Sequence, residues 1–166
     1  MSDSPPIALR SPAVDDTRDI GEALAPFLRP GDVVSLVGEL GAGKTAFVQG
    51  AARGLGVETQ VASPTFVLVR DYEGRLPVHH VDVYRLGTLQ EVIDLGFEEM
   101  IDEDAVTFVE WGSAVEALFA DRYLEIHLTG AEDSDERRIT LTTIGDGWGG
   151  DRWPDLARAL VPWSSA

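Results

Sequence analysis

The sequence has no cysteine and no asparagine, and it has only one lysine among its 166 residues. Without cysteine, the chain forms no disulfide and offers no thiolate ligand to a metal ion. No apolar run approaches the roughly 18 residues that a membrane-spanning helix needs. The first residues lack the basic and apolar segments of a secretory signal. We therefore expect a cytoplasmic protein with no membrane partner.

Basic residues are also scarce. Thirteen lysines and arginines face 29 acidic residues, so the net charge is 13 minus 29, or −16, and the isoelectric point is near 4.3. Affinity for nucleic acids comes mainly from clustered Lys and Arg side chains. This balance argues against unaided binding of DNA or RNA, so any contact with a nucleic acid should pass through a basic partner.

Strand-like and helix-like patterns alternate along the chain, which predicts an α/β fold with a mixed sheet flanked by helices and with antiparallel hairpins. We expect one domain over residues 1–144 and a partly flexible tail, 145–166, with room for one short helix. The predicted strands cover residues 7–10, 32–38, 65–72, 76–84, 105–111, 123–128 and 137–144, and the predicted helices cover 15–28, 44–55 and 89–94.

Residues 38–45 read GELGAGKT and match the phosphate-loop pattern G-x-x-x-x-G-K-[ST]. An apolar strand pattern precedes them and a helical pattern follows, which is the context that a P-loop NTPase-like domain requires. Glycines let backbone N–H groups approach phosphate oxygens at a helix N-terminus, where the helix dipole is positive. The residues that we predict to bind the nucleotide here are Gly38, Glu39, Leu40, Gly41, Ala42, Gly43, Lys44, Thr45 and Ala46.

The only lysine of the chain, Lys44, is the lysine of this motif, and all twelve other basic residues are arginine. An ammonium is a compact charge that can follow the β- and γ-phosphates, whereas a planar guanidinium is too wide for a small cradle. The exception therefore indicates a need that arginine does not meet. We predict a catalytic role for Lys44, and we predict that Thr45 offers its hydroxyl to Mg²⁺.

A phosphate loop also needs an acid that holds its metal ion, placed at the end of a neighbouring strand. Glu110 ends an apolar run and is the predicted magnesium residue. Asp82 is the second acid, and we predict that it orients water or the metal shell beside the γ-phosphate. His80 shares a strand face with Asp82, but two residues do not make a metal site. Thr65, in the segment SPTF, is a candidate sensor of the γ-phosphate.

The segments GELGAGKTAFVQG, SPTFVLVRDY, HHVDVYRL, LGFEEM and VEW occur in the order and spacing of the bacterial TsaE family. This family contains the small P-loop ATPase of the machinery that makes threonylcarbamoyladenosine in tRNA. The resemblance covers about residues 7–144. The H-x-D-x-Y-R motif of the family falls on His80, Asp82, Tyr84 and Arg85, and its E-W pair falls on Glu110 and Trp111.

The resemblance implies that the chain uses ATP and Mg²⁺, hydrolyses ATP weakly alone, and acts on a partner complex. Those partners would be TsaD and TsaB, which install the threonylcarbamoyl group on the adenosine beside the tRNA anticodon. Contact with tRNA would be indirect, and no DNA partner is implied. By the same resemblance, Thr45 and Glu110 are the magnesium residues. Trp111 and a segment before the first helix, near Asp16 and Thr17, are implied to contact the nucleotide.

Two other classes stay open on the sequence. A GTPase switch usually carries N-K-x-D to read guanine, but this chain has no asparagine and its lysine already belongs to the phosphate loop. The segment DYEG matches D-x-x-G, a pattern of low specificity. A small-molecule phosphotransferase (kinase) would need an acceptor pocket with convergent arginines. Its only candidates are Arg85, Arg137 and Arg138, and each of them could equally be a surface residue.

Overall fold

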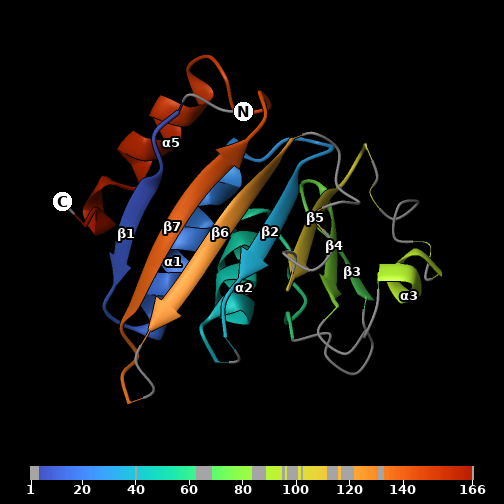
Figure 1. Cartoon of the computed structure of the whole chain (residues 1–166), viewed down its shortest axis with the longest axis horizontal. Coiled ribbons are helices and arrows are strands. Elements are labelled where there is room, and N and C mark those ends of the chain that lie inside the picture. The colour runs from blue at the N-terminus through green and yellow to red at the C-terminus, as the bar shows by residue number, and fades with distance from the viewer. Residues whose placement is uncertain are drawn as a thin grey trace.

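The computed structural model describes residues 4–39, 41–62, 69–83, 89–94, 96, 101, 103–111, 116, 122–130 and 133–165. Within these residues, seven strands form one sheet in the order β1-β7-β6-β2-β5-β4-β3 (Figure 1). The strands are β1 Ile7–Ser11, β2 Val33–Val37, β3 Val69–Glu73, β4 Pro77–Asp82, β5 Val106–Glu110, β6 Tyr123–Gly130 and β7 Arg137–Ile144. The helices on the described residues are α1 Val14–Leu24, α2 Lys44–Gly54, α3 Leu89–Asp94 and α5 Arg152–Ala159, and 3₁₀ turns cover Ala25–Phe27 and Val161–Trp163.

The central strands of the sheet pair in parallel, and the strands toward both of its edges pair antiparallel. Strand β2 pairs in parallel with β5 and β6, and β5 pairs in parallel with β4. The hairpins β6–β7 and β3–β4 and the pairing of β1 with β7 are antiparallel. The expected mixed sheet with antiparallel hairpins is thus confirmed. Because β2, β4 and β5 run in the same direction, their carboxyl ends meet at one edge of the sheet.

Helices α1 and α2 lie side by side on one face of the sheet (Figure 1). Their apolar residues, such as Ile20 and Phe47, are fully buried with Phe108 and Ile126 of the strands in the main core. Alternation along β1 and β6 leaves the opposite side chains of these strands exposed or half-buried. No helix in the described ranges has the length and apolar character needed to cross a membrane.

The first helix is shorter than its spacing predicted. It ends at Leu24, and a 3₁₀ turn with Pro26 in its first positions continues the chain. Proline lacks an N–H group and clashes with the preceding turn, so it ends the regular helix although the apolar spacing runs on. The second helix begins at Lys44 as predicted, and Gly56, just beyond its end, has φ +82°. Such a backbone angle favours glycine, which suits a helix terminus.

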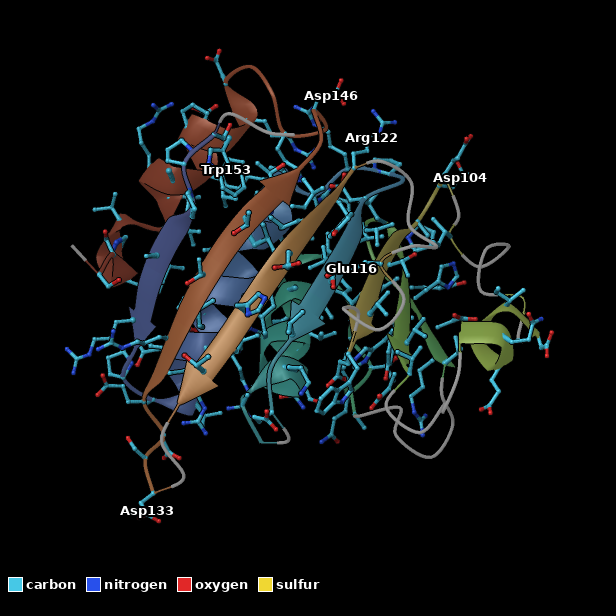
Figure 2. All side chains as sticks on the ribbon, viewed as in Figure 1. Asp104, Glu116, Arg122, Asp133, Asp146 and Trp153 are labelled. Atoms are coloured by element: carbon cyan, nitrogen blue, oxygen red, sulfur yellow. The ribbon has the colours of Figure 1, made fainter. Side chains whose placement is uncertain are left out.

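The C-terminal segment packs into the main core. Trp148 and Trp153 are each only 4% exposed, and Leu156 and Leu160 are fully buried in the same cluster as the strand residues. The indole N–H of Trp153 donates a hydrogen bond to the carbonyl of Pro5 at 2.9 Å, and Figure 2 shows this side chain where α5 passes β1. The segment after β7 therefore closes the β1 side of the sheet.

Candidate nucleotide site

The loop between β2 and α2 has a backbone that only glycine accommodates at several points. Gly41 and Gly43 have φ of +80° and +103°, in the left-handed region. A methyl group on Gly38 would lie 2.6 Å from the carbonyl oxygen of Leu128. Gly43 is the N-cap of α2, so the unpaired N–H groups of the first helical turn open into this loop. This geometry suits phosphate oxygens, which bind helix N-termini through such groups.

Lys44 is only 4% exposed, and its ammonium lies inside the loop. It donates hydrogen bonds to the carbonyl oxygens of Gly38 at 2.6 Å and of Glu39 at 3.1 Å. Burial lowers the pKa of Lys44 below the usual value of a lysine, and the nearby carboxylates of Glu110, Asp82 and Glu39 oppose that shift. The loop thus holds one partly desolvated cation at its centre.

The aromatic ring beneath this ammonium belongs to Trp111. The Nζ of Lys44 lies 4.2 Å from the ring centroid, which is a cation–π contact. Trp111 follows β5 and has φ +63°, the only positive φ of a non-glycine residue in the described ranges. Its N–H donates to the carbonyl of Leu36 at 3.0 Å. Strained backbone of this kind clusters at functional sites, where surrounding contacts hold it in place.

The two predicted acids lie together at the carboxyl ends of neighbouring strands. Asp82 of β4 is directly opposite Glu110 of β5 in the parallel register, and both are nearly buried. The hydroxyl of Thr45 donates to both carboxylate oxygens of Glu110, each at 3.3 Å. The structure therefore brings Lys44, Thr45, Asp82 and Glu110 together, and their roles stay predictions.

The contact of His80 with Glu110 is not predicted by the sequence, in which His80 only shares a strand face with Asp82. The Nε2 atom of His80 lies 2.6 Å from Oε2 of Glu110, and the imidazole is fully buried. Its Nδ1 atom has no hydrogen-bond partner among the described residues. The parallel pairing of β4 with β5 creates this contact, and pairing between strands distant in sequence has no local signal.

Thr17 lies under the loop. It is 1% exposed, its hydroxyl shares a 2.7 Å hydrogen bond with that of Ser11, and a methyl group on Gly43 would meet its Cγ2 atom at 3.6 Å. Asp16 accepts a hydrogen bond from the indole of Trp163. Both stay predictions as nucleotide contacts. The proposed sensor Thr65, and also Leu40, Tyr84 and Arg85, lie outside the described residues.

The residues present fit Mg²⁺ held together with a nucleotide, and they do not form a complete metal cage. No group of three or more His, Asp or Glu side chains in the described ranges could hold a metal ion by itself. The available donors are the hydroxyl of Thr45 and the carboxylate of Glu110, 3.3 Å apart. Mg²⁺ commonly binds one or two such protein groups and takes its remaining ligands from water and substrate phosphates.

Comparison with known proteins gives the family of this chain. Residues 11–139 match the model of the family described as threonylcarbamoyl adenosine biosynthesis protein TsaE. The chain is 43% identical over 133 residues to the tRNA threonylcarbamoyladenosine biosynthesis protein TsaE of Bacillus subtilis, a match covering 80% of this chain and 82% of the relative. It is 45% identical over 138 residues to the protein of that name from Streptomyces coelicolor, covering 79% and 93%.

A solved structure has the same fold as this chain. The crystal structure of Bacillus subtilis YdiB superimposes with a TM-score of 0.75 and 34% sequence identity, covering 98% of each chain. The resemblance that the motifs carried is therefore confirmed over most of the chain. This chain belongs to the TsaE family of threonylcarbamoyl adenosine biosynthesis proteins.

Proposed function

We propose that the chain is the Mg²⁺-dependent ATP-binding and ATP-hydrolysing subunit of tRNA threonylcarbamoylation. Membership of the TsaE family supports the role in threonylcarbamoyladenosine biosynthesis. The support for ATP chemistry is the buried Lys44 at the N-terminus of α2, next to the paired carboxylates of Asp82 and Glu110. A buried cation beside two acids at the ends of parallel strands matches the parts of a phosphoryl-transfer site.

Each of these groups has a defined task in the proposed reaction. The first-turn N–H groups of α2 and the ammonium of Lys44 would bind the β- and γ-phosphates and neutralise charge that builds up on them. Thr45 and Glu110 would hold Mg²⁺, which when bound supplies further charge neutralisation. Asp82 would orient the attacking water. His80 would fix the direction of the Glu110 carboxylate from the buried side.

The partners follow from the family resemblance. We propose that the chain acts on a complex of TsaD and TsaB and reaches tRNA only through them. The net charge of −16 agrees with a subunit that binds proteins and does not bind RNA by itself.

The competing phosphotransferase has less support from the geometry. Arg137 points at the phosphate loop and bonds to its carbonyl groups, so it does not converge on an acceptor. Arg138, the next residue on the strand, is exposed. The GTPase alternative still lacks an asparagine for the guanine-reading motif.

The test is ATP hydrolysis by the purified chain, alone and with TsaD and TsaB, with Mg²⁺ present or removed by chelation. We expect slow turnover alone, faster turnover with the partners, and none without the metal ion.

Thr45→Ala and Glu110→Ala should lower turnover by roughly ten- to several-hundredfold while the fold is kept. Parental turnover in a folded Glu110→Ala variant would show that its metal role is wrong, and transfer of phosphate to a metabolite without partners would favour the phosphotransferase.

A further inference from the structure

The side chain of Arg137, the first residue of β7, contacts the outer side of the phosphate loop. Its Nε atom donates to the carbonyl oxygen of Ala42 and its Nη2 atom donates to that of Gly41, both at 3.0 Å. One edge of the guanidinium thus binds two consecutive carbonyl groups of the loop. The loop and the β6–β7 hairpin lie at the same end of the sheet (Figure 1).

The other side of the same guanidinium is fixed to the hairpin. Its Nη1 atom donates to the carbonyl oxygens of Ser134 and Glu136. Glu136 in turn pairs with Arg10 of β1 at 2.8 Å. Figure 2 shows Asp133 at the outer tip of this hairpin. Arg137 therefore bridges a hairpin that is anchored in the sheet and a loop whose own backbone lies in the left-handed region at Gly41 and Gly43.

The direction of these carbonyl groups matters because each peptide plane points its C=O and its N–H in opposite directions. When Arg137 holds the C=O of Ala42 outward, the N–H of Gly43 points into the loop, toward the place where an anion would bind. Glycine has little intrinsic preference for one backbone conformation, and converging N–H dipoles repel one another in the absence of an anion. A cation on the outward carbonyls offsets this cost before the nucleotide arrives.

We propose that Arg137 is a positioning residue that holds the phosphate loop in its anion-binding conformation. The inference rests on the proposed function, because it assumes that the loop binds the phosphates of ATP. Lys44 bonds to the carbonyls of Gly38 and Glu39 from inside the loop, where the phosphates would compete for its ammonium. Arg137 bonds to the carbonyls of Gly41 and Ala42 from outside, where the phosphates would not compete for its guanidinium. Preorganisation of this kind raises affinity by removing an ordering cost from the binding step.

Arg138 provides a matched control within the same strand. It is the next arginine of β7, its side chain points to the opposite face because strands alternate, and it is exposed. Arg137→Ala and Arg138→Ala remove the same charge from adjacent positions. Arg137→Lys keeps the charge but replaces the planar fork, which reaches two carbonyls and the hairpin at once, by a single ammonium.

The first measurement is affinity for Mg·ATP and for inorganic tripolyphosphate by titration calorimetry. We expect Arg137→Ala to weaken both by the same factor, roughly tenfold or more, because the loss concerns the phosphates and not the base. Arg137→Lys should fall between it and the parent, and Arg138→Ala should match the parent. Turnover at saturating ATP should change much less than the KM for ATP, since the loop still forms once it is filled.

The second measurement needs no nucleotide. Hydrogen exchange of the backbone amides in residues 41–45 should be faster in the nucleotide-free Arg137→Ala and Arg137→Lys variants than in Arg138→Ala, at equal midpoints of urea unfolding. If Arg137→Ala does not fold, the comparison of Arg137→Lys with Arg138→Ala decides the question. Equal exchange rates and equal affinities in that comparison would overturn the inference.

The outcomes also separate this inference from the proposed function. A parent chain that binds ATP and tripolyphosphate, with Arg137→Ala binding both equally well, keeps the proposed function and overturns the role of Arg137. A parent chain that binds neither ligand contradicts the proposed function, and the positioning role fails with it. A lower unfolding midpoint with unchanged affinity would make Arg137 a structural residue of the hairpin and would also overturn the inference.

Discussion

Lys44 is held by two carbonyl oxygens and an aromatic ring, and each contact uses a property of an ammonium. The carbonyls of Gly38 and Glu39 converge on one small donor, and the face of Trp111 lies 4.2 Å away. A guanidinium carries its charge on a planar group, which suits bidentate partners and does not suit this closed cradle. The only lysine of the chain therefore occurs at a position where the shape of the charge matters.

The titration of this lysine can be measured directly. A chain with one lysine gives a single side-chain NMR signal when lysine is labelled at its ε-carbon. Burial lowers the pKa of Lys44 in the folded chain below its pKa in the unfolded chain. At a pH between these two values the unfolded chain binds more protons than the folded chain. The free energy of unfolding should therefore rise with pH across that range. Bound Mg·ATP should raise the pKa of Lys44, because phosphate charge favours the ammonium. Glu110→Gln should lower it further, and a higher pKa in this variant would contradict the assigned contacts.

Asp82 is predicted to matter more for turnover than for binding. If it orients water beside the γ-phosphate, Asp82→Asn should lower kcat by roughly ten- to a hundredfold and leave the Kd for ATP nearly unchanged. Lys44→Ala, measured by the same binding titration, should lose most of its affinity. A lower urea midpoint of Asp82→Asn with parental turnover would instead mark Asp82 as a structural carboxylate, since it is only 4% exposed.

The sequence predicts those site residues that belong to a short motif or lie at the end of a strand. The loop glycines and Lys44 follow from spacing alone, because the chemistry of a phosphate loop restricts each position, and Glu110 follows from its place at the end of an apolar strand. The contact of His80 with Glu110 and that of Arg137 with the loop were not predictable. Both depend on which strands become neighbours in the sheet, and long-range pairing leaves no periodic signal in the sequence.

At the scale of elements, α1 and α2 pack closely because glycines lie where they cross. A methyl group on Gly50 of α2 would lie 1.8 Å from the carbonyl oxygen of Arg18, and one on Gly21 of α1 would lie 2.3 Å from that of Phe47. Both contacts are with backbone, which has little freedom to move. The sequence predicts both helices, but the role of these glycines is visible only where the helices cross.

Gly50→Ala should therefore destabilise the fold although alanine is the better helix former. Separating the two helices should lower the free energy of unfolding by about 3 kcal/mol or more. Gly149→Ala is the control, because a methyl group there comes no closer than 3.4 Å to its nearest neighbour, the carbonyl oxygen of Asp146. Its effect should stay within about 0.5 kcal/mol. Urea unfolding of both variants gives the comparison, and equal stabilities would contradict close packing at the crossing.

At the scale of the whole molecule, the C-terminal segment is part of one continuous core. The guanidinium of Arg152 lies 3.5 Å from the ring centroid of Trp148, and it pairs with Asp32, the residue just before β2. Ser164 forms a β-bridge with Leu9, so the last turn lies along the outer side of β1. The segment thereby covers a sheet edge that would otherwise be open to pairing with another chain. The family match ends at residue 139, before this segment begins.

Trp153→Ala tests the contribution of this segment. The indole is 4% exposed and contacts Trp148 edge-to-face at 5.9 Å between ring centroids. Truncation should lower the free energy of unfolding by about 3 to 5 kcal/mol, through lost burial and the cavity that remains. Val161→Ala in the same segment should change it by less than about 0.5 kcal/mol, since Val161 is 62% exposed. Matching urea midpoints for the two variants would mean that the segment is not part of the cooperative unit.

The charge of the whole chain leads to a prediction about tRNA. Many of its cations are already engaged: Arg10, Arg18, Arg53, Arg152 and Arg158 form ion pairs with acidic side chains, and Arg137 bonds to the loop. Phosphate contacts supply most of the affinity for nucleic acids, and they are strong at about 50 mM salt. Even at that salt concentration, the purified chain should not retard the migration of tRNA in a gel-shift assay.

The same assay with TsaD and TsaB present should show the chain in a complex with tRNA. At about 150 mM salt we expect tRNA to bind that complex less tightly, because the proposed partners would supply most of the phosphate contacts. Arg138→Ala removes an exposed cation from the chain and should leave the binding of tRNA by the complex unchanged. Salt-dependent binding of tRNA by the chain alone would contradict this, and it would require a local basic surface that outweighs a net charge of −16.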